Sequence, residues 1–329
     1  MEKLILVGNP EAIHVGAHLY EGAKNLSLEL RFCDSRDAIS GPRWLAMLNW
    51  RLRGRRPTQL RRFSEQVVEA CKEFQPRWML STGLAPIEEQ ALIEIGRLGV
   101  KRLNYLTDDP WNSAHYAPWF LRALPRYDRV FSPRKANMAA LCKHGCREVS
   151  YLPFAYAPEV HFGDPANTED GPDVIFAGGA DADRVPLIVA LLRVGFHVVL
   201  YGGYWDRYAE TRSHYHGHAG PQTLRRVVGR AKIALCLVRR ANRDGHVMRT
   251  FEIPAIGACM LTEETEEHRE IFGPEGEAVV YFRSIPEMVE KARWLVDHDD
   301  ERHRLAVAAH ERIVNGRNTY KDRLAAMLV

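Results

Sequence analysis

The chain has 329 residues, of which 46% are hydrophobic and 26% are charged, and its formal net charge is +3 at pH 7. This composition is that of an ordinary globular protein, and the length predicts two domains. The small net charge argues against a nucleic-acid partner. No apolar run approaches the roughly 18 residues that span a bilayer, and the first residues do not resemble a signal peptide.

The six cysteines are scattered, mostly within apolar or helical patterns, and they show no spacing of a disulfide framework. They are Cys33, Cys71, Cys142, Cys146, Cys236 and Cys259. We therefore expect reduced thiols and a cytoplasmic location.

The first half of the chain alternates strand and helix patterns. The predicted strands cover residues 4–7, 28–32, 77–81, 102–106, 129–131 and 148–152, and the predicted helices cover residues 16–26, 64–74, 87–98 and 135–144. Alternation of this kind predicts an open parallel sheet with helices on both faces, in an α/β domain over residues 1–155.

A proline-containing segment with few periodic apolar positions follows, and we interpret residues 156–172 as a linker. A second α/β pattern covers residues 173–310. Its predicted strands are residues 174–177, 197–201, 233–238, 259–261 and 278–282, and its predicted helices are residues 184–194, 221–231, 248–255 and 285–296. We expect residues 311–329 to be helical and to pack back toward the first domain.

The segment from Arg249 to Gly257 carries the strongest functional signal. We expect a short helix that begins near Phe251 and ends at Gly257. A helix N-terminus favours anions, and the guanidinium of Arg249 is suited to phosphate oxygens. The carboxylate of Glu252 can accept hydrogen bonds from hydroxyl groups, or it can simply be a solvated acid in the first turn. A diphosphate together with hydroxyl groups describes a nucleotide-sugar.

Two glycine pairs follow predicted strands of the second domain. Gly178-Gly179 would let the backbone approach a phosphate closely, although a plain tight turn has the same pattern. Gly202-Gly203 and the aromatic residues beside them could shape a nucleotide pocket. Arg184, at the start of the next helix, either neutralises the diphosphate or is a surface arginine. Tyr201 precedes the second pair and is placed to shape a nucleotide pocket at the end of the sheet where open α/β folds bind ligands.

Residues 43–62 contain arginines and no acidic residue. The arginines are Arg43, Arg51, Arg53, Arg55, Arg56, Arg61 and Arg62, and Trp44, Leu45, Met47, Leu48, Trp50 and Leu52 are interleaved with them. One interpretation is a basic amphipathic element in peripheral contact with an anionic membrane, which would place the protein at the inner membrane face. The other is a solvated helix whose aromatic residues pack on the domain.

Seven segments, in this order, resemble the CgeB-like (spore maturation protein CgeB) glycosyltransferase family. They are residues 105–111 (with Asp108-Asp109-Pro110-Trp111), 130–137, 145–155, 175–179, 201–205, 249–257 and 313–323. The resemblance implies a GT-B fold, with two Rossmann-like open parallel-sheet domains facing a central cleft. It also implies a nucleotide-sugar donor on the second domain, no cofactor and no bound metal. The segment least similar to the family is residues 43–62.

The resemblance assigns the donor site residue by residue. Related retaining enzymes have two acids eight positions apart, and Asp244 and Glu252 match them, although Asp244 stands where the family pattern has a glutamate. Asp244 could equally cap a loop. Thr250 and Phe251 lie inside the matching motif. The loop with His214, His216 and His218 is expected near the nucleobase, and His216 and His218 are the candidates there. Alternating histidines can bind metal, but no acid or cysteine cluster accompanies them in the sequence.

The first domain is expected to hold the acceptor, whether a glycan, a lipid-linked molecule or a small molecule. Asp108 and Asp109 follow a strand and could orient or deprotonate an acceptor hydroxyl, or they could cap the turn before Pro110. His14 follows the first strand, near where inverting GT-B enzymes keep a basic histidine.

These observations predict a metal-independent glycosyltransferase, and the spacing of Asp244 and Glu252 favours a retaining outcome. Two alternatives stay open. One is a catalytically inactive GT-B-like protein that binds a sugar nucleotide or acts as a scaffold, and the other is a nucleotide-sugar epimerase.

Overall fold

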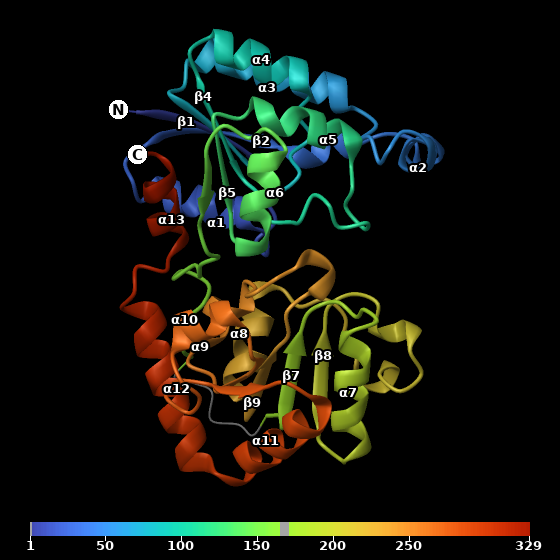
Figure 1. Cartoon of the computed structure of the whole chain (residues 1–329), viewed down its shortest axis with the longest axis vertical. Helices are drawn as coiled ribbons and strands as arrows, with labels where there is room; N and C mark the ends of the chain where they lie inside the picture. The colour runs from blue at the N-terminus through green and yellow to red at the C-terminus, as the bar shows by residue number, and fades with distance from the viewer. Residues whose placement is uncertain (1, 165–170) are drawn as a thin grey trace. The chain divides into compact units, whose positions relative to one another are not determined.

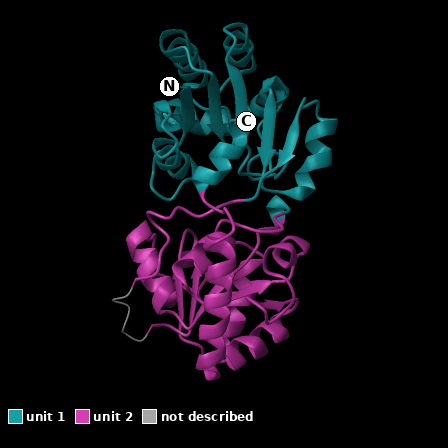
Figure 2. Cartoon of the chain, turned by 90° about the vertical axis from the view of Figure 1, so that its left-hand side faces the viewer, with its two compact units in different colours: residues 1–153, 241–243, 320–329 teal, residues 154–240, 244–319 magenta. Residues whose placement is uncertain are grey.

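The structure is a computed structural model that describes residues 2–164 and 171–329. The chain forms two compact units (Figure 2). Unit 1 consists of Met1–Pro153, Ala241–Arg243 and Tyr320–Val329, and unit 2 consists of Phe154–Arg240 and Asp244–Thr319. Each unit has its own hydrophobic core around its own sheet.

The sheet of unit 1 has six parallel strands in the order β2-β1-β3-β4-β5-β6. They are β1 (Lys3–Gly8), β2 (Glu29–Asp34), β3 (Trp78–Thr82), β4 (Lys101–Tyr105), β5 (Arg129–Ser132) and β6 (Val149–Tyr151).

Strand β1 contains the unbroken apolar run Leu4–Val7, which is fully buried because helices cover both faces of the sheet. Figure 1 shows α3 and α4 on one face and α1 on the other.

The helices of unit 1 follow the strands. They are α1 (Val15–Lys24), α2 (Arg43–Leu52), α3 (Leu60–Phe74), α4 (Glu89–Arg97), α5 (Pro118–Ala123), α6 (Met138–Lys143) and α13 (Tyr320–Met327). In α3, Phe63, Val67 and Cys71 recur at helical spacing and are buried in the core. The C-terminal α13 packs beside α1, where a Cβ on Gly22 would stand 3.0 Å from the backbone nitrogen of Lys321.

The sheet of unit 2 has five parallel strands in the order β11-β10-β9-β7-β8. They are β7 (Val174–Ala177), β8 (Val198–Tyr201), β9 (Ile233–Cys236), β10 (Met260–Glu263) and β11 (Val280–Phe282). The helices of the unit are α7 (Arg184–Arg193), α8 (Pro221–Arg230), α9 (Arg249–Ile256), α10 (Glu266–Phe272), α11 (Ile285–Asp297) and α12 (Asp299–Val314). Ser284 caps α11 by accepting a hydrogen bond from the Glu287 N–H, and Pro286 occupies its first turn.

Short 3-10 helices complete the chain: η1 (Ser35–Ile39), η2 (Leu124–Arg126), η3 (Lys135–Asn137), η4 (Trp205–Arg207), η5 (Arg212–His214) and η6 (Arg240–Asn242). Every strand expected from the sequence is present, within a few residues at its ends. Two short helices, α5 and α10, were not expected. Helix α9 begins at Arg249, one residue after the start of the helix expected over residues 248–255 and two residues before the start near Phe251 expected from the motif.

The interpretation of residues 156–172 as a linker falls partly on residues 165–170, which lie outside the described residues. In the described part, Tyr156 is buried and forms a parallel bridge with Thr319, and its N–H donates to the Asn318 carbonyl. Of the expected C-terminal helix at 311–329, residues up to Val314 complete α12 in unit 2, and α13 belongs to unit 1. Among the described residues, none of the helices is both long and apolar enough to cross a bilayer.

Candidate functional site

The strand order of unit 2 creates a switch point between β7 and β9. From β7 the chain goes outward to β8, and it then returns to the other side of β7 to form β9. In open α/β sheets, the carboxyl ends of the two strands at such a point leave room for a ligand, because the following loops diverge. The segments at this edge are Gly178-Gly179 after β7 and Leu237 after β9.

The two glycine pairs pack against each other at this edge. The Gly178 N–H donates to the Tyr201 carbonyl, and the Ala180 N–H donates to the Gly203 carbonyl. Gly202 has a φ of +118°, and a Cβ there would stand 2.4 Å from the Gly178 carbonyl oxygen, so only glycine fits. Among the described residues, the Gly179 N–H has no hydrogen-bond acceptor. That donor is available to an anion.

Arg184 joins the two strand ends at the switch point. Its Nη1 donates to the Gly179 carbonyl at 3.2 Å, and its Nη2 donates to the Leu237 carbonyl at 3.0 Å. The side chain is buried, and this burial lowers the pKa of the guanidinium. Arg184 is therefore not a surface arginine. Its contacts fix the edge of the sheet and place a positive charge beneath it.

Arg249 is the first residue of α9 and reaches the same edge. Its Nε donates to the Ala177 carbonyl at 3.2 Å, at the last residue of β7. Its guanidinium also forms an ion pair with Glu252, one turn further along the helix, and 28% of its side chain is exposed. Arg249 thus combines a fixed position beside the β7 turn with an accessible surface.

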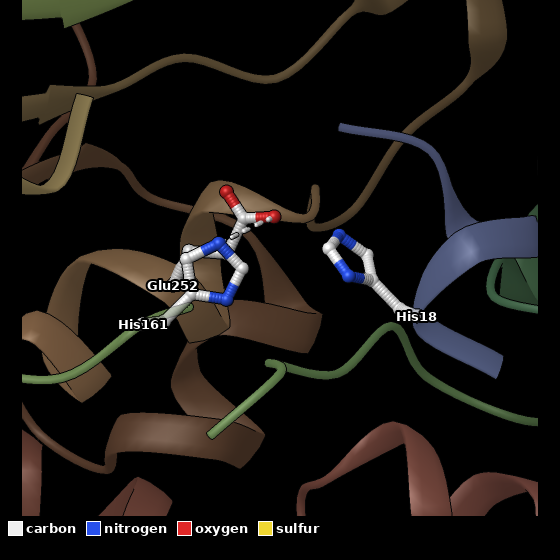
Figure 3. A group of neighbouring side chains, drawn as sticks. All are labelled: His18, His161 and Glu252. Atoms are coloured by element: carbon white, nitrogen blue, oxygen red, sulfur yellow. Dashed lines mark ion pairs between the residues drawn. The ribbon is translucent and has the colours of Figure 1, made fainter. Parts of the chain in front are cut away.

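Glu252 is buried, with 2% of the residue exposed, and it faces a second basic group (Figure 3). The His161 Nε2 lies 3.7 Å from the Glu252 Oε1. Because the His161 Nδ1 accepts a hydrogen bond from the Ala157 N–H, the proton of the neutral imidazole is on Nε2, directed at the carboxylate. His161 was not among the residues predicted from the sequence, because it lies within the segment interpreted as a linker and no motif surrounds it.

Thr250 and Phe251 point into unit 2, where they hold α9 in place. The Thr250 hydroxyl donates to the His268 Nε2 at 2.9 Å and accepts from the Val247 N–H at 3.1 Å. The Phe251 ring packs edge-on against the His246 ring, with centroids 5.6 Å apart. These contacts orient the start of the helix, so any effect of Thr250 or Phe251 on a ligand is an indirect one.

The remaining donor candidates lie around the same turns. Asp244 is partly exposed, and its negative charge opposes the lowering of the pKa of Arg184. The Tyr201 ring lies 5.7 Å from the His216 ring, and His216 and His218 are both exposed. The His216 N–H donates to the Leu200 carbonyl, so this loop follows the edge of β8.

The two acids after β4 have different environments in unit 1. Asp109 is 1% exposed and accepts hydrogen bonds from the Trp111 N–H and, through both carboxylate oxygens, from Arg243. Asp108 is partly exposed, and its Oδ1 lies 3.9 Å from the His115 Nε2. Asp109 is fully used in holding its loop, which leaves Asp108 as the acid of this pair that an acceptor can reach.

His14 is the N-cap residue of α1, directly after the loop that follows β1. Its side chain is exposed, and its Nε2 lies 3.5 Å from the Glu11 Oε2. Strands β1 and β3 form the switch point of the unit 1 sheet, because β2 lies on the other side of β1. His14 is therefore at the edge of the sheet where a ligand of unit 1 would bind.

The second half of the chain is similar to a known family, and the whole chain is similar to solved structures. Residues 184–329 match the model of a family described as glycosyl transferase-like. A search of the curated proteins found no match. Among solved structures, the chain is similar to sucrose-phosphate synthase from Thermosynechococcus elongatus, with a TM-score of 0.71, 10% identity, and coverage of 99% of this chain and 97% of that one.

Two further solved structures contain a sugar nucleotide. The Anabaena protein HepE in complex with UDP-glucose has a TM-score of 0.64 at 10% identity, over 100% of this chain and 99% of that one. UDP-GlcNAc 2-epimerase from Neisseria meningitidis, bound to UDP-GlcNAc, has a TM-score of 0.58 at 13% identity, with the same coverage of 100% and 99%. The expected GT-B fold is confirmed, and the family match over residues 184–329 confirms the expected class, a glycosyltransferase.

Proposed function

We propose that unit 2 binds the diphosphate of a nucleotide-sugar at the carboxyl ends of β7 and β9, and that the chain transfers the sugar to an acceptor held by unit 1. The observation that supports this most is the convergence of two arginines on one turn. Arg249 donates to the carbonyl of Ala177, the residue before the glycine pair, and Arg184 donates to the carbonyl of Gly179, the second residue of the pair. The Gly179 N–H has no acceptor among the described residues.

A diphosphate at this turn would receive two kinds of stabilisation. The Gly179 N–H supplies a hydrogen-bond donor, and Arg249 supplies an accessible positive charge at the positive end of the α9 dipole. As the bond between the anomeric carbon and the phosphate oxygen breaks, negative charge collects on the departing diphosphate. Fixed cations and N–H groups stabilise that charge, so this proposal needs neither a metal ion nor another cofactor.

Glu252 would contact hydroxyl groups of the donor. A donor that displaces Arg249 from Glu252 would recruit Arg249 to phosphate and leave the carboxylate to accept from a hydroxyl, with His161 holding its other oxygen. Asp244, eight residues earlier, is the candidate for contact with the transferred sugar. The spacing of these two acids favours transfer with retention of the configuration at the anomeric carbon.

On the acceptor side, Asp108 is the candidate to orient the attacking hydroxyl, since Asp109 is held by Arg243 and Trp111. The acceptor oxygen bonds to the anomeric carbon on the face that the nucleoside diphosphate leaves. The bond from the anomeric carbon to the diphosphate oxygen breaks, and the proton of the acceptor hydroxyl passes to that oxygen. We propose that the chain belongs to the CgeB-like family, on the order of its motifs. The acceptors that we propose to test are glycans, lipid-linked molecules and small molecules with a hydroxyl group.

The proposal is tested by thermal shift and calorimetry with UDP-, GDP-, TDP- and ADP-sugars, each beside its nucleoside monophosphate. We expect one diphosphate conjugate to bind and to raise Tm, and its monophosphate to bind at least about tenfold more weakly, because the β-phosphate contacts are lost. Equal binding of the two would contradict the proposed grip on the diphosphate.

Turnover separates the enzymatic alternatives. Incubation with the binding donor and a panel of acceptors should release nucleoside diphosphate with a glycosylated product. A donor converted to its epimer without any acceptor would indicate an epimerase instead. Binding with no turnover under any of these conditions would indicate the inactive binding protein.

A further inference from the structure

Helix α2 turns its apolar side chains to solvent. Trp44, Met47, Leu48 and Leu52 recur at helical spacing on one face, and their exposed fractions are 65%, 56%, 42% and 75%. The only fully buried residue of the helix is the polar Asn49, which is 3% exposed. A helix that packs on its own domain shows the opposite arrangement, so the apolar face of α2 is built for another environment.

The charges around this face are of one sign. Residues 43–62 contain no aspartate or glutamate. Arg56 and Arg61 pair with glutamates elsewhere in unit 1. Among the described residues, five further arginines of the segment pair with no carboxylate. Arg55 is partly buried and donates to a backbone carbonyl, and the other four are exposed: Arg43, Arg51, Arg53 and Arg62. The surface therefore combines unneutralised guanidinium groups with exposed indole and aliphatic side chains.

The helix is held firmly at its C-terminal end, so its exposure does not come from a loose attachment. The Arg55 Nη1 donates to the Tyr116 carbonyl at 2.8 Å, and the Trp119 Nε1 donates to the Arg55 carbonyl at 3.3 Å. The Arg55 guanidinium also lies over the Trp50 ring, 5.1 Å from its centroid. Figure 1 shows α2 at the margin of unit 1, beyond the helices that cover the sheet.

We propose that this face of α2 binds the surface of an anionic phospholipid bilayer. Indole and aliphatic side chains would enter the headgroup region, and the four exposed arginines would contact lipid phosphates. A second copy of the chain is disfavoured as the occupant, because it would bring the same positive charges to the face. The inference does not depend on the proposed function, since it rests on residues outside the candidate site and its test requires no turnover.

Vesicle flotation tests the proposal with the full chain. Vesicles of phosphatidylcholine alone are compared with vesicles that contain equal parts of phosphatidylcholine and phosphatidylglycerol, at low and high salt. We expect flotation only with the anionic vesicles, decreasing as salt rises. Light scattering of the protein without vesicles measures its molar mass, and so tests whether a second copy of the chain covers this face. Failure to float with either vesicle overturns the proposal, and a dimer that forms through α2 would then account for the face.

The first variant removes charge from the segment that carries this face, by replacing its four exposed arginines, three in or beside α2 and Arg62 in α3, with glutamine. The matched control removes the same charge from exposed arginines without a carboxylate partner elsewhere on the chain: Arg97, Arg122, Arg193 and Arg293. We expect the first variant to lower the partition coefficient on the order of a thousandfold, and the control to lower it far less, since contact rather than net charge is required. Equal losses in both would overturn the proposal.

The second variant, Trp44→Ala with Leu52→Ala, keeps every charge. We expect it to lose flotation at high salt first, because the apolar contribution is the one that salt does not screen. Since these side chains are exposed, the variant should keep the Tm of the parent chain. In the parent chain, tryptophan fluorescence should shift to the blue on addition of anionic vesicles. A shift that is just as large in the second variant would count against α2 as the contact.

Discussion

Arg184 and Arg249 stand at the same turn and differ in exposure, and this difference separates their roles. Arg184 is buried and donates hydrogen bonds to two backbone carbonyls, whereas 28% of the Arg249 side chain is exposed. A buried residue whose two terminal nitrogens both donate to backbone carbonyls supports the fold. A residue that is anchored at its Nε and accessible at its end can meet a ligand.

We predict that Arg249→Ala weakens binding of the donor by about tenfold to a hundredfold, the usual worth of a hydrogen bond to a charged group. Arg249→Lys should restore part of the affinity, since it keeps the charge and loses the fork. Calorimetric titration measures both. Arg193→Ala, an exposed arginine at the far end of α7, is the control and should bind as the parent does. Unchanged affinity in Arg249→Ala would remove Arg249 from the site.

The two acids after β4 give a second prediction. Asp109→Asn should lower the free energy of unfolding by about 2–3 kcal/mol, because it weakens a largely buried carboxylate that holds Arg243 and the Trp111 N–H. Asp108→Asn should leave the free energy of unfolding nearly unchanged and reduce kcat. Urea unfolding and product formation are measured for both variants. If Asp108→Asn is fully active, Asp108 is not the acceptor-side residue.

At the scale of the elements, the carboxyl-terminal turns of β7 and β8 depend on a close approach of two backbones. Gly202→Ala should lower the free energy of unfolding for two reasons. Alanine is strained at the positive φ of this position, and its Cβ would meet the Gly178 carbonyl, which should cost a further ~1–3 kcal/mol. Gly195→Ala is the matched control, since Gly195 also has a positive φ but open space around it. Thermal unfolding compares them. Equal Tm values would show that the two turns do not constrain each other.

The buried histidine behind α9 predicts a pH dependence of stability. Burial lowers the pKa of His268 from 6.5 to about 4, with the nearby charge of His246 acting in the same direction and that of Glu267 against it. The folded state favours the neutral ring, so the unfolded chain binds the proton first. The stability that His268 contributes is therefore complete above about pH 6.5, and about 3 kcal/mol of it is lost as the pH falls to 4.

His268→Asn should show a shallower decrease of unfolding free energy between pH 6.5 and 4 than the parent chain does. It should also be less stable at pH 7, since the bonds to Thr250 and the Glu263 carbonyl are changed. Urea unfolding at a series of pH values measures the two slopes. Parallel slopes would mean that another group titrates in this window.

The elements that the sequence predicted well are those with strong periodicity or continuous apolar runs, such as β1 and α3. Their patterns are local, so a single sequence contains them. The two helices that it did not predict, α5 and α10, are one or two turns long and offer too few positions for a period to be seen. Helix α10 has a start signal in Thr265, whose hydroxyl caps the His268 N–H, but a single cap does not predict a helix.

In the candidate site, too, local motifs predicted some residues, and contacts between distant parts of the chain were not predicted. Gly178, Gly179, Arg184 and Arg249 follow from motifs next to predicted strands, and the structure brings them to one edge of the unit 2 sheet. His161 faces Glu252 from more than ninety positions away in the chain, and the burial of Asp109 against Arg243 depends on a pairing of the same kind. Such contacts depend on topology, and no local pattern specifies them.

On the scale of the whole molecule, both sheets share the same order at the switch point. In unit 1, β2 and β3 lie on opposite sides of β1. In unit 2, β8 and β9 lie on opposite sides of β7. This order opens a ligand-binding edge at β1 and β3 in unit 1 and at β7 and β9 in unit 2. Each unit thus has one edge at which open α/β sheets bind ligands, and we propose that the donor binds at that of unit 2 and the acceptor at that of unit 1.

The most direct test is a crystal structure of the protein with the nucleotide-sugar that raises its Tm most. We predict that the diphosphate lies against the Gly179 N–H and the Arg249 guanidinium, with hydroxyl groups of the donor on Glu252. A diphosphate bound away from the carboxyl ends of β7 and β9, or on unit 1, would contradict the account.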